Sequence, residues 1–191
     1  MSVRIENRLT FVHIGKCGGI SLTNLLDEKF KTTHTEVRHD TYDELPEEWK
    51  DCVFCIIRNP FDRLLSLYHF SIIKYEKRNQ QDRLKILDKG FENYVMNEFD
   101  TPWYREIGGW RDLTQSKYFP ADKGKMQVLR LENLNEDWKK FCQQNNLPYY
   151  EIGRANATRE NNSYREHYTD QMMEIVKDKW AEDIRLGDYE F

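Results

Sequence analysis

The stretch FVHIGKCGGISLTNLL, residues 11–26, joins an apolar run to a helical pattern through a loop that carries a lysine and two glycines. The run RLTFVHI, residues 8–14, is short, apolar and β-branched, which predicts a strand that ends at Gly15. Ser21 follows the glycines and can cap a helix. The spacing of one apolar helix face is shared by Leu22, Leu25, Leu26 and Phe30. The stretch therefore predicts a strand, a glycine-bearing loop and a helix in succession.

The rest of the chain repeats this alternation of apolar runs and helical patterns. The run CVFCII, residues 52–57, is continuously apolar, as in a parallel strand that is covered on both faces. In the helical pattern Asn59–Ile73, an asparagine can cap the helix and a proline takes the first helical position. A third strand is predicted at residues 126–132, and a last helix begins near Thr169. Alternating strands and helices predict an α/β fold with a mostly parallel sheet.

The segment from residue 74 to residue 125 has a different composition, because it combines a charged stretch, KYEKRNQQDRLK, with an aromatic-rich stretch that includes Gly108 and Gly109. We expect an irregular insertion over the sheet, within a single domain that spans residues 1–191. Aromatic faces with polar neighbours suit sugar rings, although aromatic side chains are as often part of a core. The candidates for an acceptor-binding wall are Trp103, Tyr104, Trp110 and Gln115.

Composition excludes several functional classes. The hydrophobic fraction of 39% argues against disorder, and the net charge of −4 argues against a general nucleic-acid binder. No stretch resembles a signal peptide or a membrane span, so a cytoplasmic protein is expected. The C-x-x-C formed by Cys52 and Cys55 lies inside an apolar run, which favours packed thiols over a metal site. We therefore expect no metal.

The glycine-bearing loop has the outline of an anion site, because backbone N–H groups and a helix N-terminus converge after a strand. Its spacing differs from the nucleoside-triphosphate signature, since Lys16 precedes Gly18 and Gly19 instead of following the glycines. Such a loop can also be nothing more than a tight connection between a strand and a helix.

A second candidate anion site follows the next buried strand. Arg58 stands at the carboxyl end of that strand, where open parallel sheets bind ligands, and Ser66 lies on the helix that follows. A guanidinium offers two parallel donors to a phosphate, and a serine can add a hydroxyl. Taken alone, the arginine could form a surface ion pair and the serine could be a hydroxyl on a helix face. Two separated anion sites suggest a nucleotide that is phosphorylated at both ends.

The motifs FVHIGKCGGISL and CIIRNPFDRLLSLYHF together resemble the paired signatures of the sulfotransferases that use 3'-phosphoadenosine 5'-phosphosulfate. The similarity is greatest to the carbohydrate branch that contains the heparan sulfate 6-O-sulfotransferases. It extends to RHDTYDEL, LENLNEDW, NATREN, YREHYTD and EDIRLGDYEF, which cover most of the chain outside residues 74–125. The resemblance implies a P-loop-like three-layer fold, a nucleotide sulfate donor, a glycan or other hydroxyl acceptor, and adenosine 3',5'-bisphosphate as product, without a metal.

The resemblance also assigns residues to the donor. The 3'-phosphate would be held by Arg58 and Ser66, and Arg159 is a further candidate for a phosphate ligand. The 5'-phosphosulfate would be held by Lys16, Cys17, Gly18, Gly19, Ile20 and Ser21, mostly through backbone N–H groups. Three positions depart from the family pattern, because Gly15 replaces a proline and Cys17 and Ile20 each replace a threonine. Backbone binding survives these changes, although two hydroxyl donors are lost.

For catalysis the resemblance implies an in-line attack by the acceptor hydroxyl. Lys16 would meet the bridging oxygen as negative charge develops on it, and His39 would act as general base. Histidine suits this role because it can be neutral near pH 7 and still accept a proton. His34, Glu36 and Asp40 are alternative bases, whereas His13 lies in the first predicted strand and is expected to be structural.

Two other functions remain open at this stage. A nucleotide-dependent phosphotransferase would share the anion loop, but it would need Mg²⁺ ligands and usually a lysine after the glycines. A non-catalytic nucleotide- or glycan-binding module would fit if Cys17 and Ile20 mark a decayed site.

Overall fold

The computed structural model describes residues 1–36, 39–97, 114–153 and 164–191. The chain forms two compact units. The first, Met1–Arg58 with Leu113–Asn156, contains every strand of the described chain and is called the sheet unit. The second, Asn59–Asp112 with Ala157–Phe191, is built from helices in its described part and is called the helical unit.

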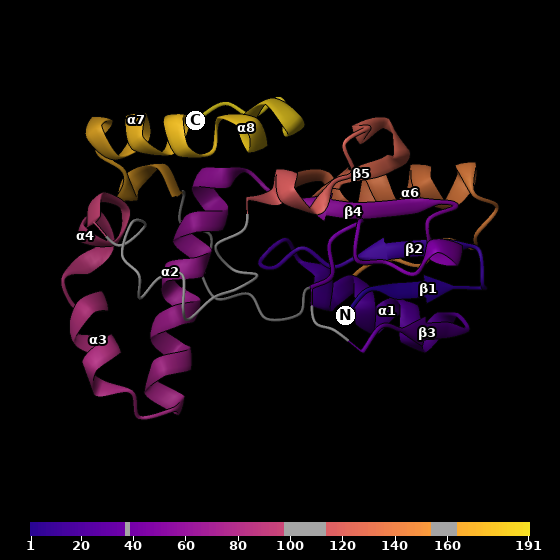
Figure 1. Cartoon of the computed structure of the whole chain (residues 1–191), viewed down its shortest axis with the longest axis horizontal. Helices are drawn as coiled ribbons and strands as arrows, with labels where there is room; N and C mark the ends of the chain where they lie inside the picture. The colour runs from indigo at the N-terminus through magenta and orange to yellow at the C-terminus, as the bar shows by residue number, and fades with distance from the viewer. Residues whose placement is uncertain (37–38, 98–113, 154–163) are drawn as a thin grey trace. The chain divides into compact units, whose positions relative to one another are not determined.

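The sheet unit holds five strands in the order β3-β1-β2-β4-β5 (Figure 1). They are β1 (Val3–Ile5), β2 (Leu9–Val12), β3 (Thr32–His34), β4 (Val53–Ile57) and β5 (Met126–Arg130). Strand β4 pairs in parallel with both β2 and β5, whereas β1 runs antiparallel to both of its neighbours. The predicted α/β fold with a mostly parallel sheet is therefore confirmed.

The sequence predicted one strand at residues 8–14, and the structure forms a hairpin at the N-terminus instead. Strand β1 folds back on β2 through Glu6 and Asn7, which both have left-handed backbone conformations with φ of 51° and 55°. Paired left-handed residues match the twist of a tight hairpin, and asparagine tolerates that conformation well. The turn is closed by the Arg8 N–H, which donates to the Ile5 carbonyl oxygen at 3.0 Å.

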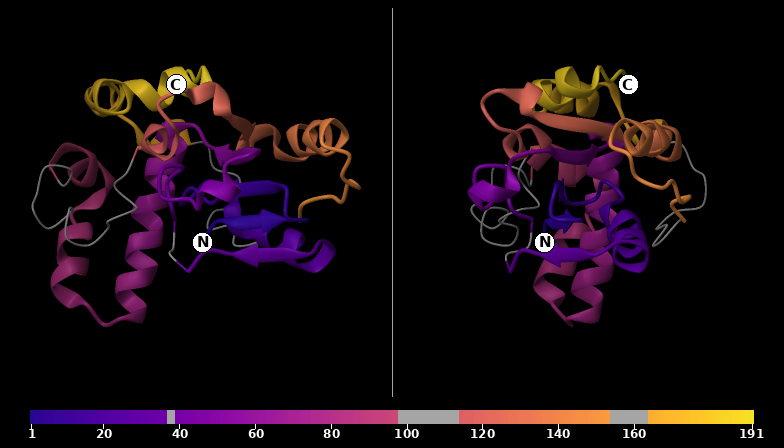
Figure 2. Two further views of the ribbon diagram at one scale, coloured as in Figure 1. Left: turned by 45° about the vertical axis from the view of Figure 1, so that its right-hand side comes forward. Right: turned by 90° about the vertical axis from the view of Figure 1, so that its right-hand side faces the viewer.

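Two helices of the sheet unit, α1 (Gly19–Lys29) and α6 (Leu134–Gln144), lie on the same side of the sheet (Figure 2). Helix α6 packs through Trp138 and Phe141, whose ring centroids lie 6.1 and 4.2 Å from that of Phe54 on β4. Trp138 is fully buried. This aromatic packing fixes the position of β4 in the sheet unit, and therefore also that of Arg58, which directly follows it.

The helical unit contains α2 (Pro60–Lys77), α3 (Gln81–Leu87), α4 (Gly90–Asn97), α7 (Asp170–Lys179) and α8 (Ala181–Gly187). Asn59 caps α2 as predicted, because its side-chain oxygen accepts the Phe61 N–H at 3.0 Å. Thr169 caps α7, which ends before Trp180, so the single last helix of the sequence analysis is two helices.

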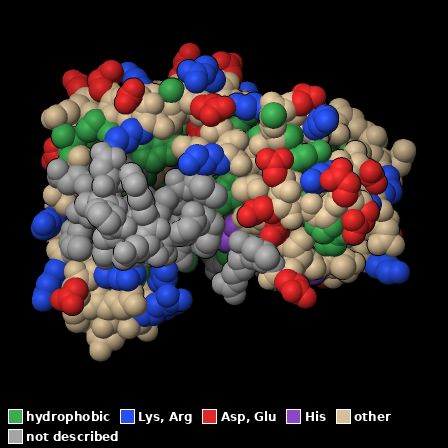
Figure 3. Space-filling model, in the orientation of Figure 1, with side chains coloured by type: hydrophobic (Ala, Val, Ile, Leu, Met, Phe, Trp, Pro, Cys, Tyr) green, Lys and Arg blue, Asp and Glu red, His purple; other side chains and the backbone are tan. Residues whose placement is uncertain are grey.

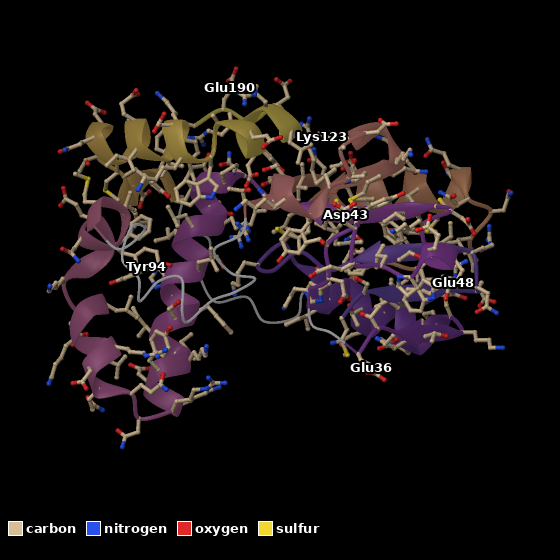
Figure 4. All side chains as sticks on the ribbon, in the orientation of Figure 1. Glu36, Asp43, Glu48, Tyr94, Lys123 and Glu190 are labelled. Atoms are coloured by element: carbon tan, nitrogen blue, oxygen red, sulfur yellow. The ribbon has the colours of Figure 1, made fainter. Side chains whose placement is uncertain are left out.

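The described part of residues 74–125 is more regular than expected, because it completes α2 and forms α3 and α4. Tyr94 of α4 faces α2, and its ring centroid lies 5.3 Å from that of Tyr68 (Figure 4). The exposed Lys77, Arg78 and Lys85 contribute to basic side chains that gather around α3 and the end of α2 (Figure 3). The charged residues of this segment thus form the solvated face of helices whose apolar face is buried. Trp103, Tyr104 and Trp110 lie outside the described residues.

Candidate functional site

The loop between β2 and α1 has an unusual backbone. Lys16 and Gly18 both have positive φ, at 68° and 77°, while Cys17 between them does not. When the sign of φ alternates along consecutive residues, their successive N–H groups turn toward one point, which is the geometry of an anion-binding nest. Gly18 adopts this conformation freely, whereas it costs a residue with a side chain, such as Lys16, on the order of 1 kcal/mol. The local backbone thus supports the anion loop that the sequence predicted.

Helix α1 begins earlier than predicted. Its N-cap is Gly18 and no side chain caps it, so the assignment of Ser21 as the cap is wrong. The left-handed Gly18 lets the chain enter the helix directly after the loop, and the Ser21 N–H already donates to the Gly18 carbonyl oxygen at 3.1 Å. The first N–H groups of a helix have no carbonyl partner inside it, and the helix dipole adds positive potential. The 49% exposed Ile20 lies in this first turn.

Both glycines of the loop lie against other side chains. A Cβ on Gly18 would come within 2.6 Å of the Leu131 side chain, directly after β5. A Cβ on Gly19 would overlap the imidazole ring of His13, directly after β2. Larger residues at either position would therefore push the first turn of α1 away from the ends of two strands.

Arg58 lies beside this loop. It directly follows β4, and parallel pairing of β4 with β2 brings their carboxyl ends to the same edge of the sheet. The Arg58 guanidinium donates from Nη1 to the carbonyl oxygen of Lys16 at 3.1 Å. The structure therefore brings together two of the residues that the sequence assigned to the donor.

Gln115 is a site residue that the sequence analysis placed in the acceptor wall. It is fully buried at the start of the 3₁₀-helix η3 (Gln115–Tyr118), and its side-chain amide pairs with the backbone of Arg58. Its oxygen also accepts the Cys17 thiol at 3.1 Å. No local pattern around Gln115 signals these contacts, because both partners are distant in sequence. In the sheet unit this side chain thus links the end of β4 to the loop, and a role for it in acceptor binding stays a prediction.

His39, the predicted base, is held against the strand that leads into the loop. It has a left-handed backbone, with φ of 63°, and its Nδ1–H donates to the carbonyl oxygen of His13 at 2.8 Å. A carbonyl oxygen can only accept, so the proton of a neutral ring sits on Nδ1 and the lone pair on Nε2. The neighbouring Asp40 is buried and accepts the Ser2 N–H at 3.2 Å and the Thr35 hydroxyl. Asp40 therefore anchors this segment.

The ring of His13 contacts both His39 and the first turn of α1. The ring centroids of His13 and His39 lie 4.9 Å apart in an edge-on arrangement. Burial, reinforced by the nearby His39 and the chain's amino group, lowers the pKa of His13 to about 3. The partly buried His13 ring is therefore neutral at physiological pH.

The remaining predicted residues lie elsewhere. His34 on β3 bonds to Asp27 at 2.8 Å, and Glu36 is an exposed surface residue (Figure 4). Ser66 is buried on α2, in the helical unit, and its role at the 3'-phosphate stays a prediction. Arg159 lies outside the described residues.

The cysteines are free thiols. Cys55 is buried while its C-x-x-C partner Cys52 is half-buried, and burial raises the pKa of both thiols. Burial also raises the pKa of Cys142 to about 12. Across the described ranges, no group of three or more His, Cys, Asp or Glu side chains could hold a metal ion.

Parallel strands that end in a glycine-bearing loop, a helix N-terminus and an arginine are an arrangement with which many α/β proteins bind phosphate-like anions. A model of the Sulfotransferase family matches residues 2–190. The chain therefore belongs to the Sulfotransferase family, whose chemistry is sulfuryl transfer. The comparisons with curated proteins and with solved structures found no match. In the part of the chain that is described, every helix is too short or too polar to span a membrane.

The contact between Gly19 and the His13 ring predicts a non-additive pair of substitutions. Gly19→Ala should destabilise the protein by about 1–3 kcal/mol, because the new methyl group overlaps the ring. In a His13→Ala background the same change should cost clearly less, since the overlapping atoms are gone. Urea unfolding of the two single variants and the double variant measures the coupling. Purely additive free energies would contradict the contact.

The lowered pKa of His13 predicts a pH dependence of stability. The folded state disfavours the charged ring, so below the unfolded value of 6.5 the unfolded chain binds the extra proton. Stability should therefore fall as the pH drops from 6.5 toward about 3, by up to about 1.4 kcal/mol per pH unit. A His13→Asn variant should lose less stability than the wild type between pH 7 and about pH 4.5. Urea titrations at several pH values test this, and equal slopes for both proteins would refute the assignment.

Proposed function

We propose that the protein transfers a sulfuryl group from 3'-phosphoadenosine 5'-phosphosulfate to an acceptor hydroxyl, and that the acceptor is a carbohydrate. The observation that carries the proposal is the bond from the His39 Nδ1–H to the His13 carbonyl oxygen at 2.8 Å. It attaches a histidine, whose neutral form has its lone pair on Nε2, to the same strand end that leads into the anion loop. A base and an anion site are the two groups that sulfuryl transfer to a hydroxyl requires.

The loop fits the phosphosulfate end of such a donor. Lys16 and Gly18 have positive φ while Cys17 between them does not, an alternation that turns successive backbone N–H groups of the loop toward one point. When bound, the donor supplies an activated sulfuryl group whose leaving group is adenosine 3',5'-bisphosphate. The Lys16 ammonium would stabilise negative charge on the bridging oxygen, an effect that mutagenesis commonly values at roughly 3–4 kcal/mol.

Arg58 suits the 3'-phosphate. A guanidinium has five N–H donors, so its bond to the Lys16 carbonyl oxygen is compatible with a further bond to an anion. Ser66 and Arg159 would complete that site, as the family resemblance implies. Because Arg58 already contacts the loop, both ends of one nucleotide would lie along a single edge of the sheet.

His39 would take the acceptor's proton. Its Nδ1–H donates to a fixed carbonyl oxygen, which orients the ring and leaves Nε2 as the accepting atom. The alternatives fit less well, since Asp40 accepts hydrogen bonds from Ser2 and Thr35, and His34, on β3, bonds to Asp27 of α1. The carbohydrate nature of the acceptor rests on the resemblance to the heparan sulfate 6-O enzymes.

Donor binding provides one test of this proposal. The wild type should bind adenosine 3',5'-bisphosphate without added metal, and Arg58→Ala should weaken the affinity about 10- to 100-fold, because a charged hydrogen bond is lost. Isothermal titration calorimetry measures both constants. Arg8→Ala is the matched control, since Arg8 bonds to the carbonyl oxygens of Asn145 and Asn146. Binding of ATP with Mg²⁺ instead would favour the phosphotransferase.

Turnover provides a test of the base. His39→Ala should lower kcat by about 10²–10⁴-fold while donor affinity changes little, because the ring would act on the acceptor hydroxyl. Transfer of radiolabelled sulfate to a panel of glycans, lipids and small alcohols measures the turnover. His34→Ala serves as the control and should keep near wild-type turnover. Full activity of a folded His39→Ala variant would assign the proton to another group, and no turnover by the wild type on any acceptor would favour a binding module.

A further inference from the structure

Gln115 is a buried polar side chain that the proposed reaction does not use. Its Oε1 accepts the Arg58 N–H at 2.8 Å, and its Nε2 donates to the Arg58 carbonyl oxygen at 2.8 Å. The β4–β5 ladder ends at Ile57, paired with Arg130, so Arg58 is the first residue past it. The side chain of Gln115 thus takes the place of a strand partner for this one residue.

The same amide reaches the anion loop. The Cys17 thiol donates to Gln115 Oε1 at 3.1 Å, and the Arg58 guanidinium donates to the Lys16 carbonyl oxygen at 3.1 Å. Cys17 and Gln115 are both fully buried. These bonds close a ring of contacts among three segments that are far apart in the sequence: the loop, the end of β4 and the start of η3.

Among side chains, a primary amide matches the hydrogen-bonding groups of Arg58 best. Arg58 presents one backbone donor and one backbone acceptor, and a glutamine offers the complementary acceptor and donor from one side chain. A carboxylate could accept from the N–H but could not donate to the carbonyl oxygen, and a thioether could do neither well. Buried groups that lose their partners bear the full cost of desolvation, so the backbone would shift to recover them.

We infer that Gln115 is a positioning residue that fixes the distance between the Lys16 loop and Arg58. This inference rests on the proposed function, in which these two segments hold the two ends of one nucleotide. A ligand with phosphates at both ends depends on that distance, whereas a ligand with one phosphate does not. Gln115 therefore determines selectivity for the doubly phosphorylated nucleotide.

The test compares two ligands on the same variants. We expect Gln115→Met to weaken adenosine 3',5'-bisphosphate binding about 10-fold, through the loss of its hydrogen bonds to the Arg58 backbone and the Cys17 thiol. Its affinity for adenosine 5'-monophosphate should change no more than about 2-fold, because a single anion contact tolerates the shift. Isothermal titration calorimetry gives both constants. The matched control is Gln127→Met, the same change at an exposed glutamine on β5, which should leave both affinities unchanged.

A second variant guards against loss of folding. Gln115→Asn keeps the amide but shortens its reach, and it should show the same selective loss, with circular dichroism and thermal melts confirming the fold. Equal loss of both ligands, or no loss in either folded variant, would overturn the inference. If the wild type itself fails to bind the bisphosphate, the proposed function fails instead, so the two failures are distinguishable.

Discussion

The parallel pairing of β2 with β4 is the constraint on which the rest of the sheet unit depends. Because Val12 pairs with Cys55 and both strands run in the same direction, the anion loop and Arg58 leave the sheet at one edge. Leu131, directly after β5, closes against Gly18 at that edge. Packing of Trp138 and Phe141 on Phe54 holds the central strand in place. Without this register, none of the polar contacts at the strand ends could form.

Much of this fold could be predicted, because its strongest elements carry local signals. The run at residues 52–57 is apolar throughout, and Asn59 followed by proline marks the start of α2. Strand β1 was missed because three residues, Val3–Ile5, are too few to show a period. The helices α3 and α4 were mistaken for irregular chain because their exposed charges mask apolar residues at helical spacing, such as Leu84 and Leu87 in α3 or Phe91 and Tyr94 in α4.

The candidate site was predictable only where its residues are adjacent in sequence. The loop and Arg58 follow strands, and a strand's end can be read from the chain. The bonds from His39 to the His13 carbonyl and from Gln115 to Arg58 join residues separated by 26 and 57 positions. No local pattern encodes such pairs. The early start of α1 was missed for a different reason, since a left-handed glycine can replace a capping side chain.

The burial of Cys17 has a consequence for chemical labelling. A thiol that is fully enclosed and donates to Gln115 reacts with an alkylating reagent only when the loop opens locally. Its labelling rate is then the product of the intrinsic thiolate reactivity and the population of the open state. Cys52, which is half-buried, provides an internal reference in the same molecule. Cys17 thus acts as a built-in probe of loop dynamics.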